Sequence, residues 1–224
     1  ANLSDFKKAY AYYEDVLRRH PTDLDILGEY ALMMLDLGDH ETAIKLYSRA
    51  VAAGPPDFRT LVAIAEAQFR AGKFETALKT YAELLHLKPA RSQLENYLRL
   101  AESMGRIEEG AEILAEYMKS SGERELKDYQ KLSYFYGILG RPDQLTATLR
   151  EAVREFPDNA VFRKQLLYAY SDNKRFDEAA ALLATFPDIA QDRELTQMYI
   201  NLLAEAKRYQ EVEDFITNEL SPEL

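Results

Sequence analysis

The sequence contains no cysteine, so neither disulfide bonds nor thiolate metal sites can stabilise the fold. Tryptophan is absent as well, and the 224 residues include only 9 glycines and 8 prolines. Because glycine and proline mark turns, their scarcity favours long helices over many short strands. No apolar run approaches the roughly 20 residues that a membrane-spanning helix needs.

Positive charge is in deficit, with 28 lysines and arginines against 38 acidic residues and a net charge of −10. Nucleic-acid affinity depends largely on basic side chains that neutralise phosphates, so this balance disfavours nucleic acid as a partner. An anionic membrane surface is disfavoured for the same reason. The hydrophobic fraction of 47% predicts an ordered soluble chain. Composition leaves the compartment unknown, cytoplasm and bacterial periplasm being equally compatible.

Motifs that carry catalysis or bind cofactors are also missing. The glycines are isolated, so no phosphate-binding loop is present, and no serine occupies a nucleophile elbow. None of the histidines His20, His40 and His86 has a second histidine at metal-ligand spacing. We therefore expect no enzyme activity, no cofactor and no metal site.

What the sequence does contain is an internal repeat of 34 residues. Prolines 21, 55 and 89 keep this interval, and so do alanines 9, 43 and 77 and tyrosines 13, 47 and 81. Independent columns with one period indicate a stacked repeat architecture. Aromatic residues in repeat columns are predicted to be core residues: Tyr47, Phe74, Tyr81, Phe176 and Tyr209.

Each repeat unit is predicted to form two amphipathic helices. In residues 24–55, apolar side chains recur at helical spacing on both sides of Gly38. Gly38 can adopt the left-handed conformation that ends the first helix. Asp39 then caps the second helix, and Pro55 ends it.

This pattern resembles the tetratricopeptide repeat, through GDHETAIKLYSRAVAAGP from Gly38 and GKFETALKTYAELLHLKP from Gly72. Weaker copies begin at Gly105, Gly140, Lys174 and Lys207. The resemblance implies an all-α fold, a right-handed superhelical solenoid of helix pairs over residues 1–224. It implies an unpaired second helix at 4–20 and six pairs at about 24–55, 58–89, 91–121, 126–157, 160–187 and 193–222. A chain that begins within a repeat is expected to belong to a longer protein.

In this family the first helix of each pair lines a concave groove where ligands usually lie. The resemblance therefore implies that Leu32 and Leu35 face the groove. Tyr134 and Tyr168 share one groove column, 34 residues apart. The predicted partner-binding residues are Arg59, Glu66, Phe69, Arg70, Glu95, Arg99, Glu102, Tyr134, Lys164, Tyr168 and Asp172.

The resemblance implies a non-enzymatic scaffold that binds a protein or peptide through the groove or another exposed surface. An alternative is a periplasmic scaffold in bacterial exopolysaccharide export, since divergent acidic repeats of this kind occur there. Such a scaffold recruits a modifying enzyme or guides a cationic polysaccharide. Helical-repeat RNA binding is disfavoured by the charge and by the 34-residue period. The basic clamp with which some relatives hold chaperone C-termini is absent from the matching columns.

Overall fold

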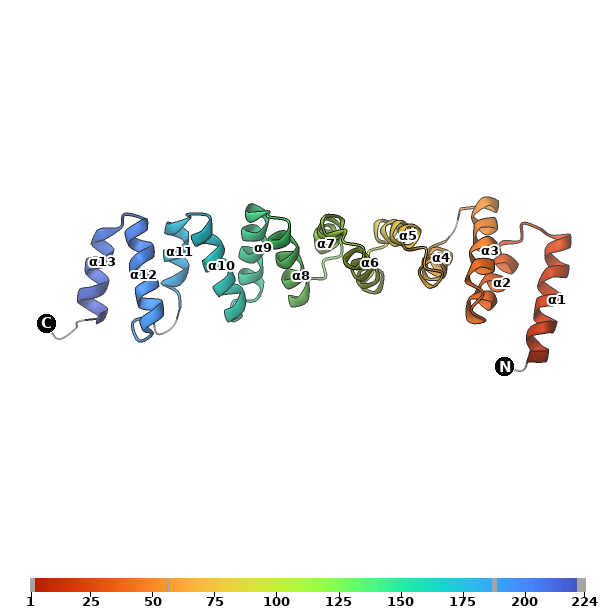
Figure 1. Cartoon of the computed structure of the whole chain (residues 1–224), viewed down its shortest axis with the longest axis horizontal. Coiled ribbons are helices and arrows are strands. Elements are labelled where there is room, and N and C mark those ends of the chain that lie inside the picture. Colours follow the sequence, from red (N-terminus) through yellow and green to blue (C-terminus); the bar gives the residue numbers. More distant parts are fainter. Residues whose placement is uncertain (1–2, 56, 187–188, 221–224) are drawn as a thin grey trace. The chain divides into compact units, whose positions relative to one another are not determined.

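The computed structural model describes residues 3–55, 57–186 and 189–220 (Figure 1). Within these ranges the chain forms thirteen α-helices and one short π-helix, and no strand. The prediction of an all-α solenoid of helix pairs is confirmed. The chain divides into two compact units, Ala1–Glu123 and Arg124–Leu224, which are described separately below. One solenoid domain over 1–224 stays a prediction.

The first unit begins with α1 (Leu3–Arg19), which is followed by three helix pairs. In each pair we call the first helix A and the second helix B. The A helices of this unit are α2, α4 and α6, and their B partners are α3, α5 and α7. Their bounds are Leu24–Asp36 and His40–Ala53, Phe58–Arg70 and Phe74–Leu87, and Arg91–Ser103 and Ile107–Ser120.

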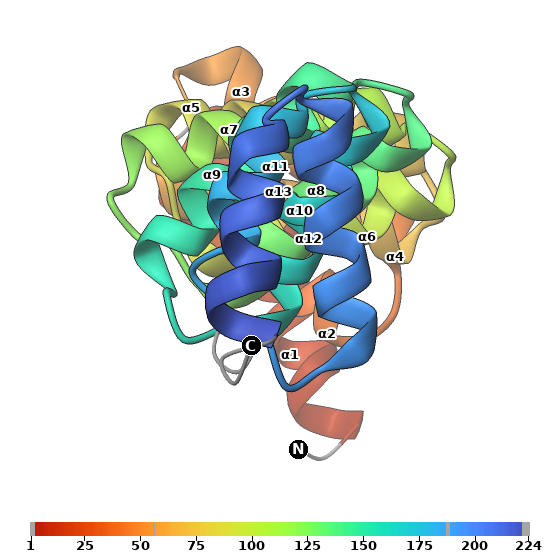
Figure 2. The same ribbon diagram turned by 90° about the vertical axis from the view of Figure 1, so that its left-hand side faces the viewer.

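The second unit contains three further pairs, with A helices α8, α10 and α12 and B helices α9, α11 and α13. Figure 2 shows α12 and α13 as neighbouring antiparallel helices. The predicted pair ends at residues 187 and 222 lie outside the described residues. The helix bounds are Leu126–Ile138 and Pro142–Glu155, Ala160–Asp172 and Phe176–Leu183, and Arg193–Glu205 and Tyr209–Phe215, followed by the π-helix Ile216–Leu220.

The turn inside each pair closes as the sequence predicts. Gly38 has a φ of +81°, and Asp39 donates its backbone N–H to the Met34 carbonyl at 2.9 Å, which is the Schellman closure. The Asp39 carboxylate accepts the N–H of Thr42 at 3.1 Å and so caps α3. In the last two pairs Lys174 and Lys207 occupy the glycine position, with φ values of 56° and 60°.

The core between paired helices is built from small and aromatic residues. Ala43 and Ala77 are completely buried, and Tyr47 and Tyr81 lie beside them. The prediction was wrong for Phe74 and Tyr209, which are 44% and 62% exposed. Both are the first residue of a B helix, at the end of the pair. Phe176 holds the same position in α11 and is partly exposed.

Ion pairs join the start of one B helix to the start of the next. At Lys73, Arg106 and Arg208, the base directly before a B helix contacts the acid at the second position of the preceding B helix. This pattern was not predicted from the sequence, although it recurs with the repeat period. The nitrogen–oxygen distances are 2.9 Å for Lys73–Glu41, 2.7 Å for Arg106–Glu75 and 3.7 Å for Arg208–Asp177.

Candidate partner-binding face

A stripe of three charged residues and one alanine runs along α4 in the first unit. Arg59, Ala63, Glu66 and Arg70 are spaced by three or four residues, so they lie on one face of the helix. Arg70 forms an ion pair with Glu66. Three of the predicted binding residues therefore line a single face of α4.

Phe69 links α4 to the next A helix. The Arg99 guanidinium lies 5.8 Å from the centre of the Phe69 ring. The centres of the Phe69 and Phe74 rings are 5.7 Å apart. Arg99 also donates a hydrogen bond to the Asn96 side chain at 2.7 Å. A cation that stacks on an aromatic face gains electrostatic attraction from the ring. The structure thus brings the predicted residues Phe69 and Arg99 into contact.

The other predicted residues of α6 are Glu95 and Glu102, which are exposed and partly exposed, respectively. On α2 the exposed Leu32 lies at a cavity, but Leu35 is 5% exposed. The prediction for Leu35 was wrong because it follows Leu27 and Ala31 along the buried row of α2 at four-residue intervals.

A cavity of about 380 Å³ lies between α2 and α4. Its volume falls within the roughly 300–1,000 Å³ that small ligand sites occupy. Tyr47 of α3 reaches the cavity from the core of the pair. The lining residues are Leu24, Asp25, Gly28, Glu29, Leu32, Tyr47, Asp57, Arg59, Thr60 and Ala63.

The Tyr47 hydroxyl has no hydrogen-bond partner among the described residues, although its side chain is 1% exposed. One repeat earlier, the Tyr13 hydroxyl meets the Glu29 carboxylate at 3.5 Å. The residue 34 positions after Glu29 is Ala63, which is too short to reach the equivalent hydroxyl. Burial raises the pKa of Tyr47 to about 12, and Glu66 and Asp36 act in the same direction, so the hydroxyl is protonated at neutral pH.

Tyr47 was predicted only as a core residue, and the cavity was not predicted from the sequence. The sequence does carry a sign of the unpaired hydroxyl. The tyrosine repeats at positions 13 and 47, but its acidic partner Glu29 has Ala63 as its counterpart 34 residues later. Arg59, one of the predicted binding residues, does line the cavity.

In the second unit, the predicted tyrosines are solvent-accessible. Tyr134 on α8 is 58% exposed and Tyr168 on α10 is 46% exposed. The Lys164 ammonium lies 6.0 Å from the centre of the Tyr168 ring, and Asp172 is exposed at the end of α10. A cavity of about 760 Å³ lies between α10 and α12, lined by Ser171, Arg193, Glu194, Gln197, Met198, Asn201, Leu202 and Glu205.

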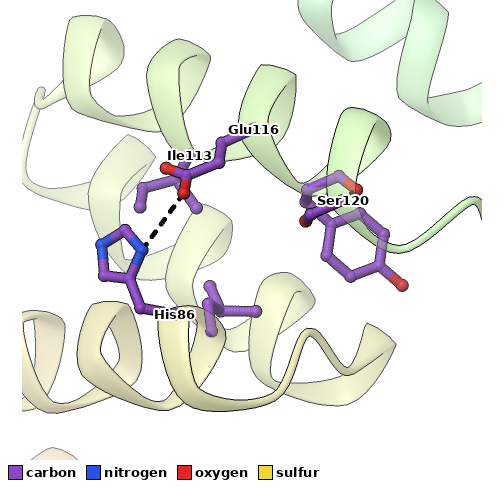
Figure 3. Close-up of a pocket in the computed structure, with 6 residues that line it drawn as sticks. His86, Ile113, Glu116 and Ser120 are labelled. Carbon is purple, nitrogen blue, oxygen red and sulfur yellow. Dashed lines mark hydrogen bonds and ion pairs between the residues drawn. The ribbon is translucent and has the colours of Figure 1, made fainter.

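A small hollow lies between two B helices of the first unit. The hollow between α5 and α7 in Figure 3 has a volume of about 10 Å³, which is room for about one water molecule. His86 Nδ1 lies 3.3 Å from a Glu116 carboxylate oxygen at its edge.

Metal ligands do not gather anywhere in the described part of the chain, where no group of three or more His, Asp or Glu side chains could hold an ion. Among the described helices, none combines the length and apolar character needed to cross a membrane.

Comparison with solved structures shows the same fold in other proteins. A chain of "Structure of Naa15/Naa10 bound to HypK-THB" is 17% identical with a TM-score of 0.60; the match covers 95% of this chain and 34% of that one. This chain therefore spans about a third of that protein's length. A tetratricopeptide repeat protein from Parabacteroides merdae is 14% identical with a TM-score of 0.46, covering 95% and 92%. YrrB, titled "a TPR protein with an unusual peptide-binding site", is 11% identical with a TM-score of 0.46, covering 83% and 96%.

No curated protein sequence matches the chain. Two family profiles, both described as "Tetratricopeptide repeat", do match it, one over residues 1–58 and the other over residues 34–96 and 139–205. The second profile alone covers more than half of the chain. The turns, helix pairs and buried alanine columns agree with these matches, and the chain belongs to the tetratricopeptide repeat family.

Proposed function

We propose that this chain is a non-enzymatic scaffold whose A-helix face in the first unit binds an extended segment of a protein partner. Repeat proteins of this family generally serve as protein-interaction scaffolds. The matched structure with a TM-score of 0.60 is by its title an assembly of proteins, which supports the same role here.

The observation that carries the proposal is the continuity of the α4 stripe. Arg59 and Ala63 line the cavity toward α2, while Glu66 and Arg70 continue the same face beside Phe69. An extended segment on this face meets a cavity first and then the Phe69–Arg99 contact. Aromatic and arginine side chains often dominate interface energies, which makes Phe69 and Arg99 the expected anchors.

A selection of displayed 12-residue peptides against the full chain tests this proposal. We expect selected peptides to lose at least about tenfold in affinity when Phe69 or Arg99 is changed to alanine, since such anchors cost roughly 2 kcal/mol or more on truncation. Lys45→Ala and Lys79→Ala on the exposed sides of α3 and α5 are matched controls and should leave binding unchanged. Peptides that respond to the lysine changes instead, or a selection without binders, would refute the proposal.

A second candidate function is the periplasmic export scaffold that guides a cationic polysaccharide or recruits its modifying enzyme. The cavity between α10 and α12 favours it, because Glu194 and Glu205 supply carboxylates and Gln197 and Asn201 supply amides. Carboxylates attract amino-sugar ammonium groups, and amides bond to sugar hydroxyls. Titration of the full chain with a glucosamine oligomer tests it. Binding that is lost with Glu194→Gln and Glu205→Gln supports this function, and no binding refutes it.

A further inference from the structure

We infer that the cavity between α2 and α4 accepts a basic side chain, a lysine or arginine, from the bound segment of the partner. This inference rests on the proposed function and specifies the chemistry of one position within it. It is carried by the charge of the cavity, by an unpaired buried hydroxyl and by the apolar walls.

The cavity has an excess of negative charge. Asp25, Glu29 and Asp57 line it against the single base Arg59. Asp57 accepts the Thr60 backbone N–H at 2.7 Å, and this hydrogen bond, with a further one from the Thr60 side chain, lowers the pKa of Asp57, which keeps it charged at neutral pH. Among the described residues Asp25 takes part in no ion pair, so its charge is available to a ligand. Three carboxylates against one guanidinium favour a cationic guest over an anionic one.

The Tyr47 hydroxyl supplies an independent reason to expect a polar guest. A buried hydroxyl without a hydrogen bond destabilises the free chain, so a ligand that supplies the missing bond gains affinity. An ammonium or guanidinium group can donate to the hydroxyl oxygen and to the carboxylates at once. The O–H of Tyr47 can then donate to a carbonyl oxygen of the same bound segment.

The apolar part of the cavity lining favours a basic side chain over a small cation. Leu24 and Leu32 are 45% and 38% exposed and line the cavity together with Ala63. Lysine and arginine bury their methylene stems along apolar surface while their charged ends reach polar groups. A metal ion or an ammonium ion has no stem to bury and gains nothing from these walls.

The test uses blocked five-residue alanine peptides with lysine, norleucine or glutamate at the centre, added to the isotope-labelled full chain and followed by NMR. We expect the lysine peptide to bind at least about tenfold more tightly than the norleucine peptide at low salt, and to shift backbone amide signals of α2 and α4. Norleucine keeps the stem and lacks the charge, so this ratio isolates the charged group. The preference should weaken as salt is raised, because exposed charges are screened.

Two variants examine the cavity itself. Ala63→Gln places an amide where Glu29 stands one repeat earlier, within reach of the Tyr47 hydroxyl, and should abolish the lysine preference. Tyr47→Phe removes only the hydroxyl and should reduce the preference several-fold. Tyr81→Phe, in the same column one repeat later, is the matched control and should leave it intact. Circular dichroism verifies that each variant keeps its helix content.

The outcomes separate this inference from the proposed function. If peptides selected on the A-helix face bind but lysine and norleucine peptides bind equally, the inference is wrong and the proposed function stands. If neither selected nor alanine-based peptides perturb this face, the proposed function itself fails. A glucosamine oligomer that perturbs α2 and α4 when the lysine peptide does not would assign the cavity to a saccharide and overturn the inference.

Discussion

Arg106, directly before α7, holds Glu75 at the start of α5, with a guanidinium nitrogen 2.7 Å from the carboxylate. The same arginine donates to Glu109 within its own helix at 2.6 Å. These carboxylates raise the pKa of Arg106 and thus favour its charged form. One side chain therefore fixes the start of its own helix and the spacing to the preceding pair.

We expect Arg106→Gln and Glu75→Gln to show a favourable coupling in a double-mutant cycle measured by urea unfolding. The coupling should shrink as salt is raised, because the pair is accessible to solvent. Asp15→Asn with Arg18→Gln, a pair within α1 at 3.8 Å, is the control and should show weaker coupling. No measurable coupling between Arg106 and Glu75 would show that the contact between pairs adds nothing to stability.

Lys174 and Lys207 stand where the other pairs have glycine, in the left-handed conformation. A non-glycine residue in this conformation costs about 1–2 kcal/mol. A glycine avoids this cost, but its larger conformational entropy in the unfolded chain offsets part of the stabilisation. We predict that Lys174→Gly raises the free energy of unfolding by up to about 1 kcal/mol. Gly140→Lys should lower it by a similar amount. Thermal unfolding followed by circular dichroism measures both.

Ala43 is completely buried between α2 and α3. We predict that Ala43→Leu lowers the free energy of unfolding by roughly 1–3 kcal/mol, because extra methylenes overfill a close contact. Ala52→Leu on the exposed side of the same helix is the control and should change it by less than about 0.5 kcal/mol. Equal effects at both positions would contradict the repeat register.

Asp39 provides a pH-dependent contribution to stability. Hydrogen bonds from the side chain and the backbone N–H of Thr42 lower the pKa of Asp39 in the folded chain. A carboxyl with a lowered folded-state pKa stabilises above its unfolded value of about 3.9, and the contribution is lost as pH falls through the folded value. Asp39→Asn keeps an acceptor without this titration.

The difference in unfolding free energy between wild type and Asp39→Asn should therefore be constant above about pH 5 and decrease as the pH falls below about 4. Asp39→Ala should cost about 0.5–2 kcal/mol at pH 7, since it removes the cap altogether. A difference that does not vary with pH would show that the carboxylate charge plays no part in the cap.

Tyr134 and Tyr168 remain predicted contacts of the second unit. Changing both to alanine should weaken binding of the natural partner at least about tenfold, as expected of exposed aromatic anchors, with helix content preserved. Val161→Ala, an exposed apolar residue of α10, is the control. Unchanged binding in the double variant would remove the tyrosines from the proposed site.

The sequence predicted the turns and helix pairs because these depend on local residues that repeat, such as Gly38, Asp39 and Ala43. It failed at Phe74 and Tyr209 because a repeat column does not say how far a side chain at a helix end reaches. The contact of Phe69 with Arg99 depends on the distance between two different helices. The same is true of the missing hydrogen bond at the Tyr47 hydroxyl. Such distances follow from packing, which a single sequence does not encode in its periodicity.

Glu29 and Ala63 occupy equivalent positions of two successive repeats, and both repeats keep the same helix pair. The tyrosine is present in both repeats, as Tyr13 and Tyr47. The second repeat has no carboxylate at position 63, and the Tyr47 hydroxyl at the cavity between α2 and α4 has no hydrogen-bond partner among the described residues. Because each repeat contacts only its neighbours, such an exchange alters recognition at one place along the array and leaves the rest as inherited. A single substitution at position 63 would therefore change the chemistry of this one cavity and leave the packing of the other repeats as it is.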